Sequence, residues 1–256
     1  MSISLIAAAL LASLTGATGP EKSPDACASF VAPAKGILPR PPGAEIYKRV
    51  GNAYVTASTY SDEGTVTVEL KPPGAAMIVE RAAFRTRYSR PKRFLFEFRR
   101  EGADESFVVW SPEARFNTWW SATGVHEEYR EGEGAHAFGV SAAPTMNAVL
   151  VIAPMLFWDS GLEGPVRSMR EPSLLGHEVI DGQCHYRIGA RIRLNHWGDA
   201  DRMTTLWVGT KDFLVRKIVE DTPSNAAGGQ IERTTITMKP LVGAAIPASK
   251  FAFSPN

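Results

Sequence analysis

The sequence of 256 residues has no excess of charge of either sign. Its 28 basic and 27 acidic residues give a formal net charge of +1. Proteins that bind nucleic acids usually present a basic face, so this balance argues against a nucleic acid partner. The sequence also lacks a glycine-rich phosphate-binding loop and a cluster of three or four metal ligands, so we expect neither a cofactor nor a metal ion.

Cysteine is scarce as well, with only Cys27 and Cys184 in the chain. A disulfide between them would form if the protein is exported to an oxidising compartment. Two free thiols are the alternative, because no distance can be read from a sequence. Lipid modification of Cys27 is less favoured, since the preceding residues 24–26, Pro-Asp-Ala, lack the aliphatic residue of a lipobox.

No apolar run is long enough to cross a bilayer comfortably. The first 19 residues, MSISLIAAALLASLTGATG, are apolar and end in small residues, which is typical of a signal peptide. A buried N-terminal helix is the alternative, because no Lys or Arg precedes the apolar run. We expect residues 20–42, rich in proline and alanine, to form a flexible leader, and residues 43–256 to form a single domain.

The hydrophobic period of the domain changes from that of a helix to that of strands. Apolar residues recur every three or four positions from Gly43 to Tyr60, which predicts an amphipathic helix that stops at residues 61–64. Short alternating segments follow between Gly, Pro and acidic turns, and they predict an antiparallel meander. Two hairpins are predicted between residues 176 and 220, the first turning at Asp181-Gly182, and residues 230–239 predict a last strand.

Large aromatic side chains gather in the meander. Phe94, Phe96 and Phe98 share one face of a strand, and a sheet face with this much ring area needs a cover or a ligand. The segment from Pro144 to Gly161 is apolar nearly all round and contains Pro154, so we interpret it as a broken helix that covers this face; plain core is the alternative. Ten side chains are expected to line an apolar ligand site: Phe94, Phe96, Phe98, Trp110, Trp120, Met155, Phe157, Trp158, Leu206 and Trp207.

The strand after Asp181-Gly182 is expected to have a dry face and a wet face. Strand alternation places Cys184, Tyr186, Ile188, Ala190 and Ile192 on the dry face, and Gln183, His185, Arg187 and Arg191 on the other.

Catalytic chemistry has little support in the sequence. Ser141 lies in FGVSA, which holds only half of the G-x-S-x-G nucleophile motif. His177 and His185 could pair across the hairpin, but two ligands are fewer than a zinc site uses. The arginines between Arg81 and Arg99 are expected on the outer face of the sheet, where anionic head groups are one option for their partners. We therefore expect the protein not to be an enzyme.

Five segments together resemble the superfamily of periplasmic lipoprotein carriers, LolA and LolB with their LppX-like and RseB-like relatives, and especially a predicted periplasmic branch of it. They are FRTRYSRPKRFLFEF (84–98), NTWW (117–120), DGQCHYRI (181–188), TLWVGTKDFLVRKI (205–218) and FAFSP (251–255). The resemblance implies a mainly β fold of the α+β class, a curved antiparallel half-barrel whose concave face is covered by helices. It also implies an apolar cavity that holds acyl chains. The functional arginine of these carriers is not assigned among Arg85, Arg87 and Arg93.

Two hypotheses for function follow from the resemblance. The leading one is a non-catalytic periplasmic protein that shelters a lipid or lipoprotein acyl chain between the sheet and a helical lid, with peripheral membrane contact as an option. The other is a sensor or scaffold of the cell envelope that uses the same fold to bind a protein partner.

Overall fold

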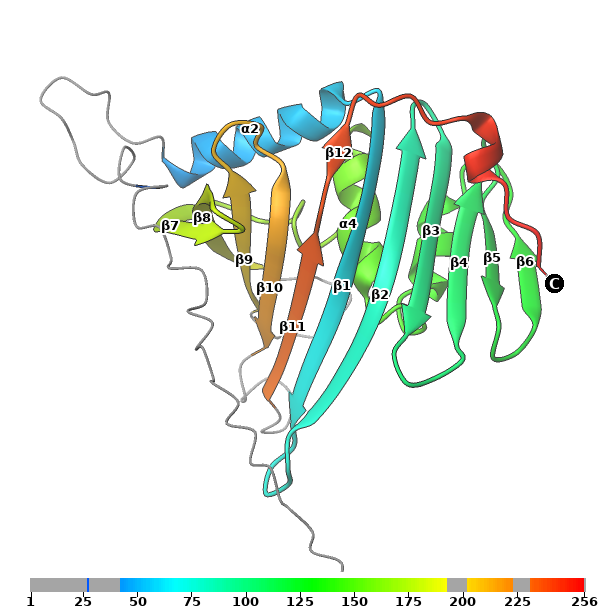
Figure 1. The fold of residues 1–256 in the computed structure, drawn as a ribbon, viewed down its shortest axis with the longest axis horizontal. Helices are drawn as coiled ribbons and strands as arrows, with labels where there is room; N and C mark the ends of the chain where they lie inside the picture. The colour runs from blue at the N-terminus through cyan, green and yellow to red at the C-terminus, as the bar shows by residue number, and fades with distance from the viewer. Residues whose placement is uncertain (1–26, 28–41, 193–201, 223–230, 256) are drawn as a thin grey trace, which may run out of the picture.

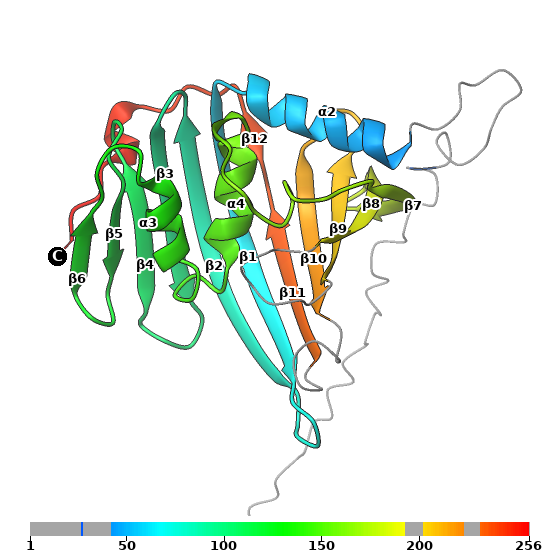
Figure 2. The ribbon, with the colours of Figure 1, turned by 180° about the vertical axis from the view of Figure 1, so that it is seen from behind.

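The computed structural model describes residue 27 and residues 42–192, 202–222 and 231–255. The expected signal peptide lies outside these residues, as does the expected leader apart from Cys27 and Pro42. The described strands form one antiparallel sheet in the order β6-β5-β4-β3-β2-β1-β11-β10-β9-β8-β7, with β12 paired to β1 (Figure 1). Helices lie over one face of this open sheet (Figure 2). The predicted α+β half-barrel with a helical cover is confirmed.

The strands run in two series that meet at β1 and β11. Gly64 of β1 pairs with Met238 of β11, and the pairing continues to Lys71 and Ile231. The strands of the first series are β1 (Thr59–Lys71), β2 (Ile78–Ser89), β3 (Arg93–Arg100), β4 (Ser106–Ser111), β5 (Asn117–Trp120) and β6 (Val125–Glu128). Those of the second series are β7 (Ser173–Ile180), β8 (Gln183–Ile192), β9 (Arg202–Gly209), β10 (Val215–Thr222), β11 (Ile231–Met238) and β12 (Leu241–Val242).

The predicted N-terminal helix is present as α2 (Gly43–Thr56), but it ends before Tyr60. Residues 59–64, expected as the end of a helix and a turn, instead begin β1. The reason is tertiary pairing, because this part of β1 bonds both to β2 and, at Tyr60 and Ser61, to β12. Two neighbouring strands outweigh the local turn preference of Ser-Asp-Glu-Gly.

Two α-helices follow the meander, where one broken helix was predicted. The first is α3 (Gly134–Val140), which lies outside the predicted segment 144–161. The second is α4 (Ala148–Leu156), and Pro154 lies inside it without interrupting it. The break falls earlier, where Met146 and Asn147 have positive φ angles of 50° and 62°. The short 3-10 helices are η2 (Trp158–Ser160) and η3 (Ala248–Phe251).

We call residues 134–160 the cover, and the sheet face that carries α2, α3 and α4 the inner face. The main hydrophobic core lies between this face and the helices, and it includes Ile46, Val50, Phe96, Ile152 and Leu206, all completely buried. The hairpin turn predicted at Asp181-Gly182 is confirmed, with φ angles of 49° and 73° as a two-residue hairpin of this kind requires.

Candidate functional site

An aromatic cluster joins the sheet to the cover. The ring of Phe94 on β3 lies 5.5 Å from that of Phe138 on α3 and 5.7 Å from that of Phe157, measured between centroids. Phe116 lies 4.9 Å from Phe138, and Tyr88 of β2 lies 5.0 Å from Phe157. The contacts are edge-to-face or tilted, which is the arrangement that ring quadrupoles favour. The rings of the chain itself therefore occupy the space between β2, β3 and the cover.

The inner face continues this apolar surface toward the middle of the sheet. Phe96 stacks on Phe84 of β2 at 5.6 Å and lies 6.4 Å from Phe98. These positions share a face because directly opposed residues on antiparallel strands point the same way, and Phe98 pairs with both Phe84 and Phe107. An extended aromatic surface thus runs across three adjacent strands.

The helix α4 meets this surface with apolar side chains only. Every one of its residues except Leu150 is buried. A helix that is apolar all round must be enclosed, and here the sheet and α2 enclose it. Because its contacts are non-directional, their strength depends on the area buried and not on a particular polar partner.

Polar ties to the rest of the protein lie at the two ends of the cover. Arg90 donates a hydrogen bond to Asp159 at 2.8 Å, just after α4, and Lys92 pairs with Glu131, just before α3. Arg90 also donates to the carbonyl oxygens of Ala57 at 3.1 Å and Tyr54 at 3.3 Å. The β2–β3 turn therefore contacts the chain at both ends of the cover. No local pattern predicts this arrangement, because the partners are 39 and 69 residues apart in the sequence.

The structure places eight of the ten expected lining residues on the inner side of the sheet or in the cover. Of these, Trp158 packs against α2, where its ring lies so close to Gly51 that a Cβ there would come within 2.9 Å. The eight are Phe94, Phe96, Phe98, Trp120, Met155, Phe157, Trp158 and Leu206.

Trp110 and Trp207 were expected in the same site, and the structure contradicts this. Trp110 pairs with Leu95, so it points to the outer face, where it belongs to a separate apolar cluster. Trp207 also faces outward, donating from Nε1 to Glu178 Oε2 at 2.8 Å beneath Lys217 Nζ, which lies 4.4 Å from the ring centroid. Register between β3 and β4 decides the face of Trp110. Alternation within β9 decides that of Trp207, because it is adjacent to Leu206 and must point to the opposite face.

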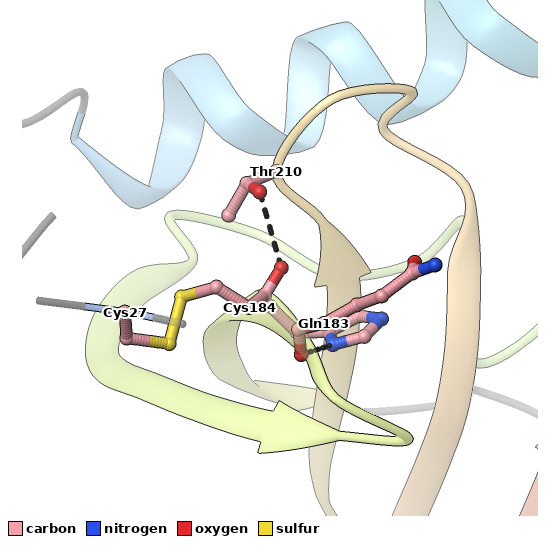
Figure 3. The surroundings of a disulfide bond; sticks show 5 residues. Cys27, Gln183, Cys184 and Thr210 are labelled. Carbon is pink, nitrogen blue, oxygen red and sulfur yellow. Dashed lines mark hydrogen bonds between the residues drawn. A yellow bond between two sulfur atoms is a disulfide. The ribbon is translucent and has the colours of Figure 1, made fainter. Parts of the chain in front are cut away.

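The β7–β8 hairpin carries a disulfide between Cys27 and Cys184, with Cα atoms 5.2 Å apart (Figure 3). Thr210 donates a hydrogen bond to the carbonyl oxygen of Cys184 at 3.1 Å. The bridge fixes residue 27 on the second series of strands. His185, expected on a wet face, is only 2% exposed; its Nδ1 donates to the Gln183 carbonyl oxygen at 2.8 Å, and burial lowers its pKa.

Two carboxyl groups, those of Asp62 and Glu220, are buried on the inner face. Burial raises the pKa of Asp62 to about 6, although the Tyr60 hydroxyl donates to its Oδ2 at 2.6 Å and lowers the pKa. Burial also raises the pKa of Glu220 to about 7. Neither residue could be found from the sequence, since nothing local distinguishes them from surface carboxylates.

The outer face carries an open groove with a volume of about 1150 Å³. Charged side chains of both signs line it, and many pair with one another: Arg85 lies 3.1 Å from Glu63 and 3.9 Å from Glu97. Arg85, Arg87 and Arg93 all point away from the cover, as expected for arginines on the outer face. None of these three is in a position to contact the cover.

The catalytic candidate Ser141 lies in the interior, just after α3. The Ser141 hydroxyl is buried and donates to the Ala137 carbonyl oxygen at 2.6 Å, so a helix carbonyl uses its proton. In the part of the chain that the structure describes, no group of three or more His, Cys, Asp and Glu side chains could hold a metal ion.

None of the helices in the described residues is long and apolar enough to cross a membrane. No protein-family model matches the chain, and no curated protein sequence matches it. Among solved structures, the chain is similar in fold to LprF from Mycobacterium bovis, with 14% identity over 81% of this chain and 97% of that one and a TM-score of 0.45. A LolA superfamily protein from Nitrosomonas europaea is 10% identical over 83% and 98% of the two chains, with a TM-score of 0.34.

The protein MucB, solved in complex with MucA(peri), is 13% identical, with a TM-score of 0.41. This match covers 83% of the present chain and 60% of MucB. None of these similarities identifies what the chain binds.

Proposed function

We propose that the protein is a non-catalytic binding protein of the bacterial periplasm that shelters a lipid or lipoprotein acyl chain between the inner face and the cover. The observation that supports this most is the aromatic cluster, in which Phe138 and Phe157 of the cover meet Phe94 and Phe116 of the sheet side by ring contact alone. An acyl chain can replace such contacts, because dispersion and burial of apolar area need no directional partner. In this structure the cover lies closed on the inner face.

Entry of a chain requires the cover to move away from the sheet. Such a movement would break two ion pairs, and both are partly exposed. The side chains of the Arg90–Asp159 pair are 25% and 55% exposed, and those of the Lys92–Glu131 pair are 49% and 63% exposed. Exposed ion pairs contribute only about 0–1 kcal/mol each. Burial of an acyl chain returns about 0.8 kcal/mol per methylene, so a chain of ordinary length offsets the loss of ring contacts.

The disulfide supports the proposed location. A bridge between Cys27 and Cys184 persists in oxidising compartments such as the periplasm and is rare in the cytosol.

A second function, a scaffold that binds a protein partner, is favoured by two features. The interior is already filled with the protein's own rings, and the outer face carries the open groove of about 1150 Å³. This alternative predicts a stoichiometric protein partner and no lipid.

Binding of a fluorescent C16 acyl probe, together with native mass spectrometry of the protein extracted gently from envelopes, tests the proposal. Phe138→Ala removes a ring from the cover and leaves space that an acyl chain can fill, so the probe should bind this variant at least as tightly as the wild type. Phe253→Ala removes a ring from the outer cluster and serves as the matched control, with unchanged probe affinity. Absence of co-purified lipid together with absence of probe binding in all three proteins would refute the proposal.

A further inference from the structure

Asp62 of β1 and Thr86 of β2 lie directly opposite each other on the inner face. Asp62 is 3% exposed and Thr86 is completely buried. Both positions break the apolar character of the surface around them, because the residues at the neighbouring inner positions of these strands are Tyr60 and Tyr88 on one side and Gly64 and Phe84 on the other.

The hydrogen bonds of this pair are incomplete. Asp62 Oδ2 accepts a hydrogen bond from the Tyr60 hydroxyl. Asp62 Oδ1 and Thr86 Oγ1 are both buried, and neither completes a hydrogen bond of good geometry among the described residues, although Thr86 lies close enough to the Asp62 carboxyl to lower its pKa. Buried polar atoms in native proteins are nearly always paired, so two adjacent ones without partners require an explanation. The pair offers an acceptor, and a hydroxyl that both donates and accepts, to a third group.

The pair borders the aromatic surface. Thr86 lies two residues from Phe84 on β2 and is opposed by Phe96 on β3, whose ring lies 6.4 Å from that of Phe98. Directly opposed side chains are about 5 Å apart across a sheet. A ligand whose apolar chain runs over these rings would therefore have its polar end within reach of Asp62 and Thr86.

The charges near the pair restrict the chemistry of that polar end. The charged side chain that acts on Asp62 is Glu63, which is acidic, and the uncharged groups near it are Tyr54, Tyr60 and Thr86. A ligand carboxylate or phosphate at this point would meet the negative charge of Asp62, on which no cation of the described residues acts. A cationic group would lose its hydration and gain only the Asp62 carboxylate as a partner, and burying a charge in this way is unfavourable in an apolar site.

We propose that Asp62 and Thr86 form a polar anchor for an uncharged hydrogen-bond donor of an acyl ligand, such as a glyceride hydroxyl or an amide N–H. This inference rests on the proposed function and narrows its ligand class. The anchor selects neutral acyl lipids that carry a donor close to the chain over free fatty acids and over esters that have no donor.

Three C16 ligands that differ only in the polar end test the anchor: 1-monopalmitoylglycerol, methyl palmitate and palmitate. Displacement of the C16 probe at pH 7.5 gives their relative affinities. The wild type should bind the monoglyceride about tenfold more tightly than the methyl ester, the value of one net hydrogen bond, and palmitate should bind no better than the ester. Palmitoylamine, included as a cation, should not exceed the monoglyceride.

Asp62→Leu and Thr86→Val should abolish the preference for the monoglyceride while methyl palmitate still binds. Asp62→Asn keeps the shape of the side chain and guards against a folding defect in the leucine variant. Thr118→Val is the matched control, because Thr118 is a buried threonine of the same sheet on β5 whose hydroxyl has a partner in Tyr129. This control should keep the preference.

Each remaining outcome overturns the anchor. Equal affinity of the wild type for the monoglyceride and the methyl ester would refute it and leave the proposed function standing. Absence of binding of any acyl ligand to the wild type would refute both. A preference unchanged in Asp62→Leu, with a single water bridging Oδ1 and Oγ1 in a wild-type crystal structure, would show that the pair binds only a structural water.

Discussion

Leu95 of β3 and Trp110 of β4 are paired across the sheet on its outer face, where the C-terminal segment covers them. Phe251 is completely buried in this cluster, and the ring of Phe253 lies 5.0 Å from that of Trp110. The alternating aromatics at the end of the chain therefore hold the C-terminal segment on the face opposite the cover. The sheet is apolar on both faces at β3 and β4, with a different part of the chain covering each.

Phe251→Ala should lower the free energy of unfolding by about 3–5 kcal/mol, because it leaves a large cavity under a completely buried ring. Urea denaturation followed by tryptophan fluorescence measures the change, and Trp110 and Trp119 report on the site itself. Phe253→Ala should lower the free energy of unfolding by less, since Phe253 is only partly buried. Equal and small effects of both substitutions would contradict this account of the C-terminal segment.

Loss of the disulfide should destabilise the protein by about 2–5 kcal/mol, because the bridge closes a loop of 157 residues and restricts the unfolded chain. Cys184→Ala and Cys27→Ala should have the same effect, and a reducing agent should reproduce it in the wild type but not in either variant. Thr210→Val removes only the hydrogen bond to the Cys184 carbonyl and should cost about 1 kcal/mol. A reducing agent that leaves the wild-type denaturation midpoint unchanged would show that the bridge is absent.

The buried carboxyl groups make stability depend on pH in a direction opposite to that of acid denaturation. Burial raises the pKa of Asp62 from 3.8 to about 6 and that of Glu220 from 4.5 to about 7, so the folded state holds both protons more tightly than the unfolded state. Their contribution therefore favours folding at low pH and is lost as the pH rises from about 4 to about 7. Each group contributes about 3 kcal/mol to the free energy of unfolding at low pH, and this contribution is lost over that interval.

Asp62→Asn and Glu220→Gln should each flatten this part of the profile and raise the free energy of unfolding at pH 8 relative to pH 5. Chemical denaturation of the wild type and both variants at several pH values between 4 and 8 measures the effect as a difference. Profiles that run parallel for all three proteins would mean that neither group has a raised pKa.

Asp159→Asn should loosen the cover without unfolding the protein, because it weakens the link from the β2–β3 turn to the end of α4. Hydrogen exchange of amides in residues 134–160 should become about two- to fivefold faster, in keeping with about 0.5–1 kcal/mol for a partly exposed ion pair. Asp221→Asn breaks a similar pair with Arg233 on β10 and β11 and should leave exchange of the cover unchanged. Uniform acceleration in both variants would point to general destabilisation instead.

Much of the fold follows from patterns within single elements. The period of two predicted the strands of the meander, and the Asp181-Gly182 pair predicted its hairpin, because these signals depend on backbone geometry that neighbouring residues determine locally. The helix α3 was missed because a seven-residue segment with two glycines has little intrinsic helix propensity, and packing of Phe138 against Phe94 and Phe116 stabilises it.

Strand alternation alone places Phe94, Phe96 and Phe98 on one face and Leu206 and Trp207 on opposite faces, and the apolar character of residues 148–156 requires that they be enclosed. Which face each neighbouring strand presents depends on the tertiary structure, because strand period says nothing about register between strands. That is why Trp110 lies under Phe251, and why the charged Asp62 of an expected turn is buried opposite Thr86 on the inner face. Pairing over long separations fixes these positions, and local residue preferences carry no information about it.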